Sequence, residues 1–321
     1  MVPNRLAAGI FAVALTVFGV HCIHAQPYPS RPIRIATTQA GGGSDFLARL
    51  VGQGITGPLG QPVVIDNRGG GATISGEIVA RAEPDGYTLL AAAGTLWIGS
   101  LLRKTSYDPL KDFSPITLAI STPNVLVVHP SVANSVRELI ALARAKPGVL
   151  NYGSGATGAS SHIAGELFKH MAQVDIVRVP YKGSGLAVNA VMSNEVQLMF
   201  PNGNLVVSYV KAGRLKALAV TSAEPFSALP ELPTVAAAGL PGYEAELYTG
   251  LLAPARTPAA IIKRLNYEIV RYLRTPRVKD SLMRSGGSEV VASTPGQFSA
   301  KIRSEMVRVG NLIKETGIRA E

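Results

Sequence analysis

The residues best suited to binding chemistry lie in four glycine-rich turns, at 40–45, 69–71, 93–95 and 153–158. Each turn is predicted to follow a β-strand and to precede an α-helix. The first N–H groups of a helix have no partner within it, and the helix dipole makes this end positive. Such turns therefore favour the binding of a small anion, above all a carboxylate.

The first turn, residues 40–45, combines three glycines with a serine and an aspartate. The backbone around Gly41 and Gly42 can surround a carboxylate, while Asp45 either caps the following helix or receives a ligand amine. A purely structural turn is the alternative interpretation.

The next two turns carry weaker signals. Residues 93–95 can present the N–H group of Gly94 and the hydroxyl of Thr95 to a ligand, although a plain turn explains them equally well. Residues 69–71 have no adjacent pair of hydroxyl side chains, which favours a structural turn.

The N-terminus has the features of a secretory signal peptide over residues 1–25. Arg5 precedes an apolar run at 6–20, and Ala25 provides a small residue for cleavage. The run is too short for a permanent membrane anchor. Cleavage removes Cys22, the single cysteine, so we expect a periplasmic protein without disulfides or cysteine-based metal sites.

The fourth turn, residues 153–158, matches the dinucleotide-binding pattern G-x-G-x-x-G. In that pattern an acid about 20 residues further on closes the second strand and contacts a ribose. Here Asp175 comes before the predicted strand at 176–179, and an exported protein does not meet a nicotinamide pool. A carboxylate-binding loop that uses Ser154 and Thr157 is therefore the preferred hypothesis, and no cofactor is expected.

Catalytic and metal-binding residues are few. The exported chain keeps only His129, His162 and His170, and it contains neither G-x-S-x-G nor H-E-x-x-H. Lys182 precedes its glycine, so it does not fit a P-loop. We predict no catalytic residue and no metal site; an exported hydrolase of small esters or amides is the enzymatic alternative.

The elements that must position these turns form two blocks of alternating strands and helices. The first block predicts strands at 33–37, 62–65 and 87–90 and helices at 44–54 and 73–82. The second predicts a helix opened by a capping box of Ser135 and Glu138. It continues with strands at 150–152, 176–179, 196–200 and 216–220 and helices at 160–171, 184–192 and 205–211. This order is typical of an α/β fold with two sheets, each covered by helices.

Three amphipathic helices close the chain, each opened by a Thr-Pro pair, at 257–258, 275–276 and 294–295. We expect them to return to the first block. The chain then crosses between the blocks near 125–129 and near 248–253, which predicts a hinge with a ligand cleft. The expected division is residues 26–127 plus 250–321 as lobe I and residues 128–249 as lobe II.

Composition fits this picture. The 321 residues are 47% hydrophobic and 16% charged, which excludes a disordered or collagen-like chain and allows two domains. The formal charge is +10. Most of it lies on the C-terminal helices without interleaved aromatic residues, so we read it as a solvated face and expect no nucleic-acid partner.

Short tracts with a recognisable order run along the whole mature chain. They are PSRPIRI at 29–35, GG at 41–42 with Asp45, NR at 67–68, PDGYTLL at 84–90, YDP at 107–109, NYGS at 151–154, HIAGE at 162–166, VPYKG at 179–183, AVTS at 219–222 and LPT at 232–234. Together they resemble the Bug family, the extracytoplasmic solute receptors of tripartite tricarboxylate transporters. The resemblance implies a two-lobed periplasmic binding protein of type II topology. It also implies a small organic anion as ligand and membrane transporter subunits as partners. We expect a monomer; a sensor that serves a signalling kinase is the alternative.

The family's ligand loops carry over only where this chain matches them. Thr37 and Thr38 stand where the family usually has proline and an aromatic residue, which implies a smaller, more polar pocket face suited to a bulkier or more hydroxylated ligand than the common dicarboxylates. Asn202 follows Pro201 where the family often has aspartate. An acid to pair with a ligand amine is thus missing there. The expected ligand-binding residues are Thr38, Gln39, Gly41, Gly42, Ser44, Asp45, Gly94, Thr95, Ser154, Thr157, Gly158, Ser160, Tyr181 and Asn202.

Overall fold

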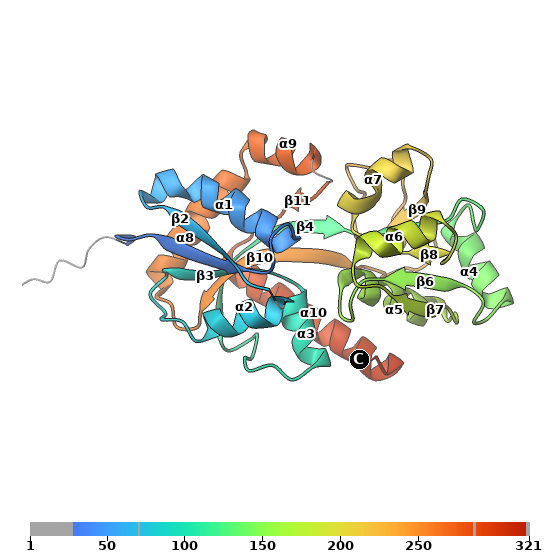
Figure 1. The fold of residues 1–321 in the computed structure, drawn as a ribbon, viewed down its shortest axis with the longest axis horizontal. Coiled ribbons are helices and arrows are strands. Elements are labelled where there is room, and N and C mark those ends of the chain that lie inside the picture. Colours follow the sequence, from blue (N-terminus) through green and yellow to red (C-terminus); the bar gives the residue numbers. More distant parts are fainter. Residues whose placement is uncertain (1–27, 70, 285–286, 319–321) are drawn as a thin grey trace, which may run out of the picture.

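The computed structural model describes residues 28–69, 71–284 and 287–318, so the predicted signal peptide lies outside the described residues. These residues form two mixed β-sheets, each with helices on both faces (Figure 1). The predicted α/β fold with two sheets is therefore confirmed.

The first sheet has six strands in the order β11-β4-β10-β3-β1-β2. They are β1 (Ile33–Thr37), β2 (Val63–Asn67), β3 (Thr88–Ala93), β4 (Phe113–Pro123), β10 (Glu246–Pro254) and β11 (Glu289–Val290). Strand β1 pairs in parallel with β2 and β3, as the β-α-β-α-β pattern requires, and β10 runs antiparallel to β3 and β4.

Helices α1 (Gly43–Leu59) and α8 (Ala259–Leu273) pack together on one face of this sheet, and α9 (Pro276–Arg284) contacts α8 and β11. Helices α2 (Gly71–Ala80), α3 (Thr95–Leu102) and α10 (Pro295–Thr316) cover the other face. Helix α1 runs five residues beyond its predicted end, past Pro58, and stops at Gly60 in the left-handed conformation.

The second sheet has five strands in the order β7-β6-β8-β5-β9. They are β5 (Val125–Val128), β6 (Asn151–Ser154), β7 (Val177–Pro180), β8 (Leu198–Met199) and β9 (Lys216–Val220). Helices α4 (Val136–Ala145) and α5 (Ser160–Ala172) cover one face, and α6 (Ser184–Met192) and α7 (Gly203–Lys211) the other.

The chain passes from the first sheet to the second at Asn124, between β4 and β5, and returns through residues 221–245 into β10. The expected first crossing, 125–129, begins one residue later, on β5. The expected second crossing, 248–253, lies inside β10, where the strand already pairs with β3 and β4.

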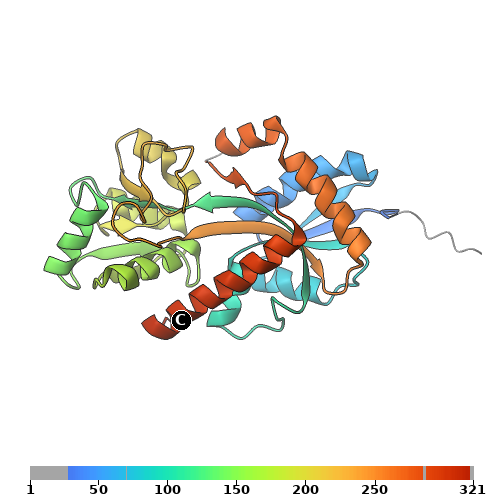
Figure 2. The same ribbon diagram turned by 180° about the vertical axis from the view of Figure 1, so that it is seen from behind.

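Helix α10 reaches both parts of the molecule. It packs on β4 and α3 of the first part and also on α5 of the second (Figure 2). One continuous hydrophobic core accordingly runs from α3 and α10 to α4 and α5. The C-terminal helix therefore does more than return to the first sheet.

Some local predictions need correction. Strand β4 was not predicted, because residues 116–123 are buried on both faces and show no polar–apolar alternation. Pro258 is the residue before α8 and not its first residue. Ser135 accepts the N–H of Glu138 as predicted, but the Glu138 carboxylate accepts the N–H of Asn134, so the capping box is not reciprocal.

Candidate ligand-binding site

A cavity of about 200 Å³ lies where the two sheets meet, and we call it the inter-sheet cavity. Its lining residues are Gly41, Gly42, Gly43, Phe46, Ile120, Thr122, Asn202, Asn204, Leu247, Thr249 and Ser288. Most of the wall comes from the unit of the six-stranded sheet, through the β1–α1 turn with the start of α1, β4, β10 and the segment before β11. The unit of the five-stranded sheet contributes the N-terminus of α7. Among these described lining residues none is charged.

The N-terminus of α1 opens into this cavity. Gly42 is its N-cap residue, and no side chain caps it. Gly41 has φ +85°, a left-handed conformation that favours glycine, so the residue type fixes the shape of the turn. The first N–H groups of a 17-residue helix are thus left for a ligand or water.

Asp45 holds this turn in place. It is 3% exposed, and its carboxylate accepts hydrogen bonds from the Gly41 N–H at 2.9 Å, Asn67 Nδ2 at 2.7 Å and Arg49 Nε at 3.1 Å. Burial alone would raise the pKa of Asp45, but the hydrogen bonds from Arg49, Asn67 and Gly41 outweigh it and hold the pKa below its usual value. The sequence analysis expected Asp45 to cap α1 or to receive a ligand amine. Instead, Asp45 does not cap α1, and its carboxylate already accepts three hydrogen bonds within the protein.

Asn202 brings the second part of the molecule to the cavity. The hydroxyl of Ser160, at the start of α5, lies 3.1 Å from Asn202 Oδ1 and 3.3 Å from Asn124 Oδ1. Asn124 is fully buried at the crossing between the sheets, and its N–H donates to Thr221 Oγ1 at 2.9 Å. A polar network thus links the cavity wall to the crossing, and the sequence analysis missed Asn124. The one amide side chain in residues 116–128, directly before an apolar run, was the available signal.

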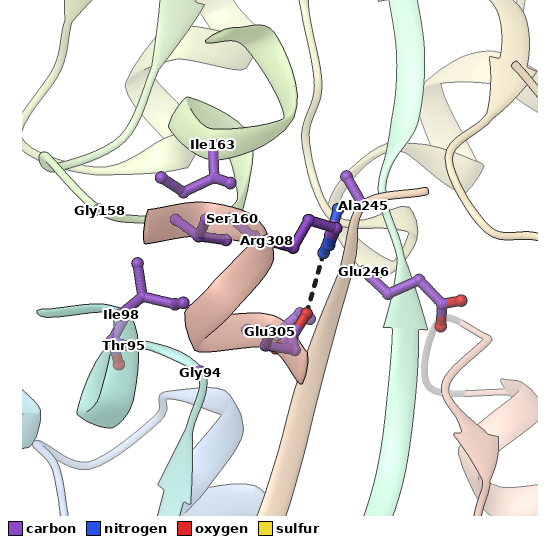
Figure 3. Close-up of a pocket in the computed structure, with 12 residues that line it drawn as sticks. Gly94, Thr95, Ile98, Gly158, Ser160, Ile163, Ala245, Glu246, Glu305 and Arg308 are labelled. Carbon is purple, nitrogen blue, oxygen red and sulfur yellow. Dashed lines mark hydrogen bonds and ion pairs between the residues drawn. The ribbon is translucent and has the colours of Figure 1, made fainter. Parts of the chain in front are cut away.

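A second, much smaller pocket lies on the other side of Leu247, which lines both spaces. Its volume is about 30 Å³, room for about one water molecule. Four predicted residues meet here, Gly94, Thr95, Gly158 and Ser160, beside the ion pair of Arg308 and Glu305 (Figure 3). This pocket joins α3, α5 and α10 but is too small for an organic acid.

The turn at 153–158 uses its own hydrogen-bonding groups internally. The Gly155 N–H donates to Ser161 Oγ at 3.1 Å, and the Gly158 N–H donates to His162 Nδ1 at 3.0 Å. Burial, with smaller effects of Arg178 and Lys169, lowers the pKa of His162 to about 3, so its ring is neutral and can accept this bond. The G-x-G-x-x-G turn thus closes on its own helix.

Ser154 and Thr157 contact Arg178 and not the inter-sheet cavity. Ser154 is fully buried, and its Oγ accepts Arg178 Nε at 2.8 Å, while Thr157 Oγ1 accepts Arg178 Nη2 at 3.2 Å. Thr157 and Tyr181 line a separate surface hollow with Arg178 and Lys182.

The structure thus brings together only part of the predicted set. Gly41, Gly42 and Asn202 line the inter-sheet cavity, whereas Thr38, Gln39, Ser44, Asp45 and Ser154 line neither space. The lining residues that the sequence analysis missed are Gly43, Phe46, Ile120, Thr122, Asn204, Leu247, Thr249 and Ser288. Most of them belong to β4, β10 and the segment before β11, none of which the sequence predicted.

Two further findings concern only the described part of the chain. No group of three or more His, Cys, Asp or Glu side chains there is placed to hold a metal ion. None of the helices in that part has the length and apolarity needed to cross a bilayer.

Two α/β units joined by two crossings, with a cavity between them whose described lining residues carry no charge, define a bilobal ligand-binding protein. Comparison with known proteins agrees. The model of the tripartite tricarboxylate transporter family receptor, TctC, matches residues 47–318, and the chain belongs to this family. This is a family of solute-binding receptors and not of enzymes. The family match confirms the resemblance to Bug proteins that the sequence tracts indicated.

Individual relatives cover nearly the whole chain. A UPF0065 protein in the tcbD–tcbE intergenic region of Pseudomonas sp. strain P51 is 35% identical over 99% of this chain and 95% of its own length. The solved structure of R. palustris Rpa4515 with adipate has a TM-score of 0.79 and 34% identity, over 91% of this chain and 99% of that one. The periplasmic binding protein BugD has a TM-score of 0.76 and 29% identity, over 92% of this chain and all of that one.

Proposed function

We propose that this chain captures a small organic acid in the inter-sheet cavity and delivers it to the membrane subunits of a tripartite transporter. The observation that carries this proposal is the uncapped N-terminus of α1, where Gly41, Gly42 and Gly43 line a cavity of about 200 Å³. The adipate in the related Rpa4515 structure supports an organic acid as the ligand.

The N-terminus of α1 supplies the binding energy for a carboxylate. A hydrogen bond to a charged group contributes about 1.5–3 kcal/mol, and two or three such bonds beyond the cost of ordering reach micromolar affinity. The N-terminus of α7 faces the same cavity with Asn202 and Asn204, and no side chain caps it either. A second polar group of the ligand can bind there.

Closure around the ligand completes the proposed cycle. The chain crosses between the two units at Asn124 and through residues 221–245, and α10 packs on both units, so closure bends these crossings while the units move against α10. Residues 1–25 direct export in this proposal, and the mature protein works in the periplasm, where it meets its ligand before the membrane subunits.

Gly43 offers a direct test because it is the first residue of α1. Proline is well tolerated at this helix position and removes its N–H, and the ψ of 168° at Gly42 suits a following proline. Gly43→Pro should weaken the binding of adipate at least about tenfold in calorimetric titration, the loss of one charge-assisted hydrogen bond. Gly43→Ala keeps the N–H, and its Cβ meets no atom within 4 Å, so it should bind like the wild type.

Equal affinities of the two Gly43 variants would show that α1 does not hold the carboxylate. A wild-type protein that binds no member of a panel of mono-, di- and tricarboxylates would overturn the proposed function altogether.

A further inference from the structure

Three lining residues of the inter-sheet cavity are large and apolar, namely Phe46 on α1, Ile120 on β4 and Leu247 on β10. Across the paired strands Ile120 lies opposite Thr249 and Leu247 opposite Thr122, so the sheet side of the cavity is mixed and Phe46 is its largest apolar side chain. Phe46 lies three residues after Gly43 on α1, so the two share a helix face and the aromatic side chain stands beside the anion-binding end of the helix. It is 38% exposed, a large apolar surface left open to the cavity and to solvent. An apolar part of a ligand would cover this surface.

The hydroxyl groups of the cavity are partly occupied already. Thr122 Oγ1 and Ser288 Oγ lie 2.8 Å apart and bond to each other. A ligand hydroxyl that faces Phe46 would leave water and gain no partner there, and one turned to the sheet side would compete for Thr122 and Ser288, which already bond to each other.

The cavity also lacks a partner for a ligand ammonium group. None of its described lining residues is acidic, and Ser285 and Gly286, the two residues near Ser288 that the structure does not describe, carry no charge by type. The nearby carboxylate of Asp45 already accepts bonds from Gly41, Asn67 and Arg49. A bound ammonium would therefore be buried beside the positive ends of α1 and α7.

We propose that Phe46 is a specificity-determining residue, and that this cavity selects organic acids with an unsubstituted hydrocarbon middle over acids of equal length that carry hydroxyl or ammonium groups. The inference rests on the proposed function, because it takes the inter-sheet cavity as the ligand site. Phe46 supplies an aromatic surface that the sequence analysis did not foresee, because it expected a polar pocket face from Thr38, which does not line the cavity.

Three acids with the same six-carbon chain and two terminal carboxylates test the selection: adipate, galactarate with four hydroxyl groups, and 2-aminoadipate with one ammonium group. In calorimetric titrations the wild type should bind adipate at least about tenfold more tightly than either of the others. Phe46→Ala should weaken adipate binding about five- to tenfold and change galactarate binding less than about twofold. Phe46→Leu, which restores apolar area, should recover most of the adipate affinity.

Each result decides the matter. Galactarate or 2-aminoadipate binding as tightly as adipate would overturn the selection, while the proposed function would stand because an acid still binds. An equal loss for all three acids in Phe46→Ala would show that Phe46 only supports the fold of α1. The Gly43 variants report separately on the carboxylate site, so failure of the proposed function is recognisable by itself.

Discussion

The two strongest glycine-rich turns of this chain have similar sequences and opposite uses. In the turn at 40–45, the carboxylate of Asp45 accepts the N–H of Gly41 and so holds the turn in place. The N-terminus of α1 stays uncapped and open to the inter-sheet cavity. In the turn at 153–158, Ser161 and His162 accept the backbone N–H groups themselves. The first turn leaves N–H groups available to a ligand, whereas the N–H groups of Gly155 and Gly158 in the second turn already donate to side chains of the helix that follows.

Glycine content by itself therefore does not define an anion site. Helices α1, α3, α5 and α7 begin where the two sheets meet, and no side chain caps them. A missing side-chain cap does not set them apart, because α6 and α8, which begin away from this region, have none either. What distinguishes α1 and α7 is that their N-termini face one cavity of sufficient volume. The availability of the N–H groups and the space in front of them decide the function.

Removal of Asp45 should have the largest effect, because it takes away the group that organises the first turn. Asp45→Ala leaves the Gly41 N–H and Asn67 amide without their buried acceptor, and we expect the free energy of unfolding to fall by about 3 kcal/mol. Urea denaturation measures this loss, and adipate titration of the remaining folded protein should show strongly reduced binding.

Asp66 is the matched control. It pairs with Arg34 and Arg68, both substantially exposed, so Asp66→Ala should cost less than about 1 kcal/mol. If the two aspartate variants lost the same stability, the special role of Asp45 in the first turn would be refuted.

His162 makes the second turn sensitive to acid. Its pKa is about 3 in the folded protein and about 6.5 in the unfolded chain, so the unfolded state takes up the proton first as the pH falls. Stability is therefore fully present above pH 6.5 and falls by up to about 1.4 kcal/mol per pH unit down to pH 3. Between pH 6.5 and 4.5, urea denaturation should show a loss of about 2–3 kcal/mol that His162→Gln removes.

His129 provides the control for this pH dependence, because it lies near the surface and its ring contacts Ser131. His129→Gln should keep the pH dependence of the wild type. A His162→Gln protein with an unaltered pH profile would mean that the Gly158 N–H does not depend on a neutral imidazole.

The smallest effect is expected where the second turn was predicted to bind the ligand. Ser154→Ala with Thr157→Val removes two acceptors of Arg178 and no group that lines the inter-sheet cavity. Adipate affinity should change less than about threefold, while stability should fall by about 1–2 kcal/mol. A loss of affinity above tenfold would instead make the two turns equivalent partners in ligand binding.

The sequence alone determined much of the architecture. Strand 33–37, helix 184–192 and strand 216–220 have the predicted bounds, because the β-branched residues of the first, the glycine before the second and the apolar residues of the third act locally. The helix opened by Thr294 and Pro295 also has its predicted cap, with Gln297 completing the box. Family membership followed from tracts spread along the whole chain, and the family comparison confirms it.

Which of these parts form the site depends on how the chain packs in three dimensions. Phe46, Thr122, Leu247 and Ser288 converge on one cavity from positions far apart in the chain, so no local pattern marks them. Side chains that are distant in the sequence also decide whether the N–H groups of a turn are open or already bonded. Asn67, for example, donates to the Asp45 carboxylate that holds the first turn. The sequence therefore specifies the helices and strands through local interactions, whereas the binding surface arises from packing and from the competition among side chains for the same hydrogen bonds.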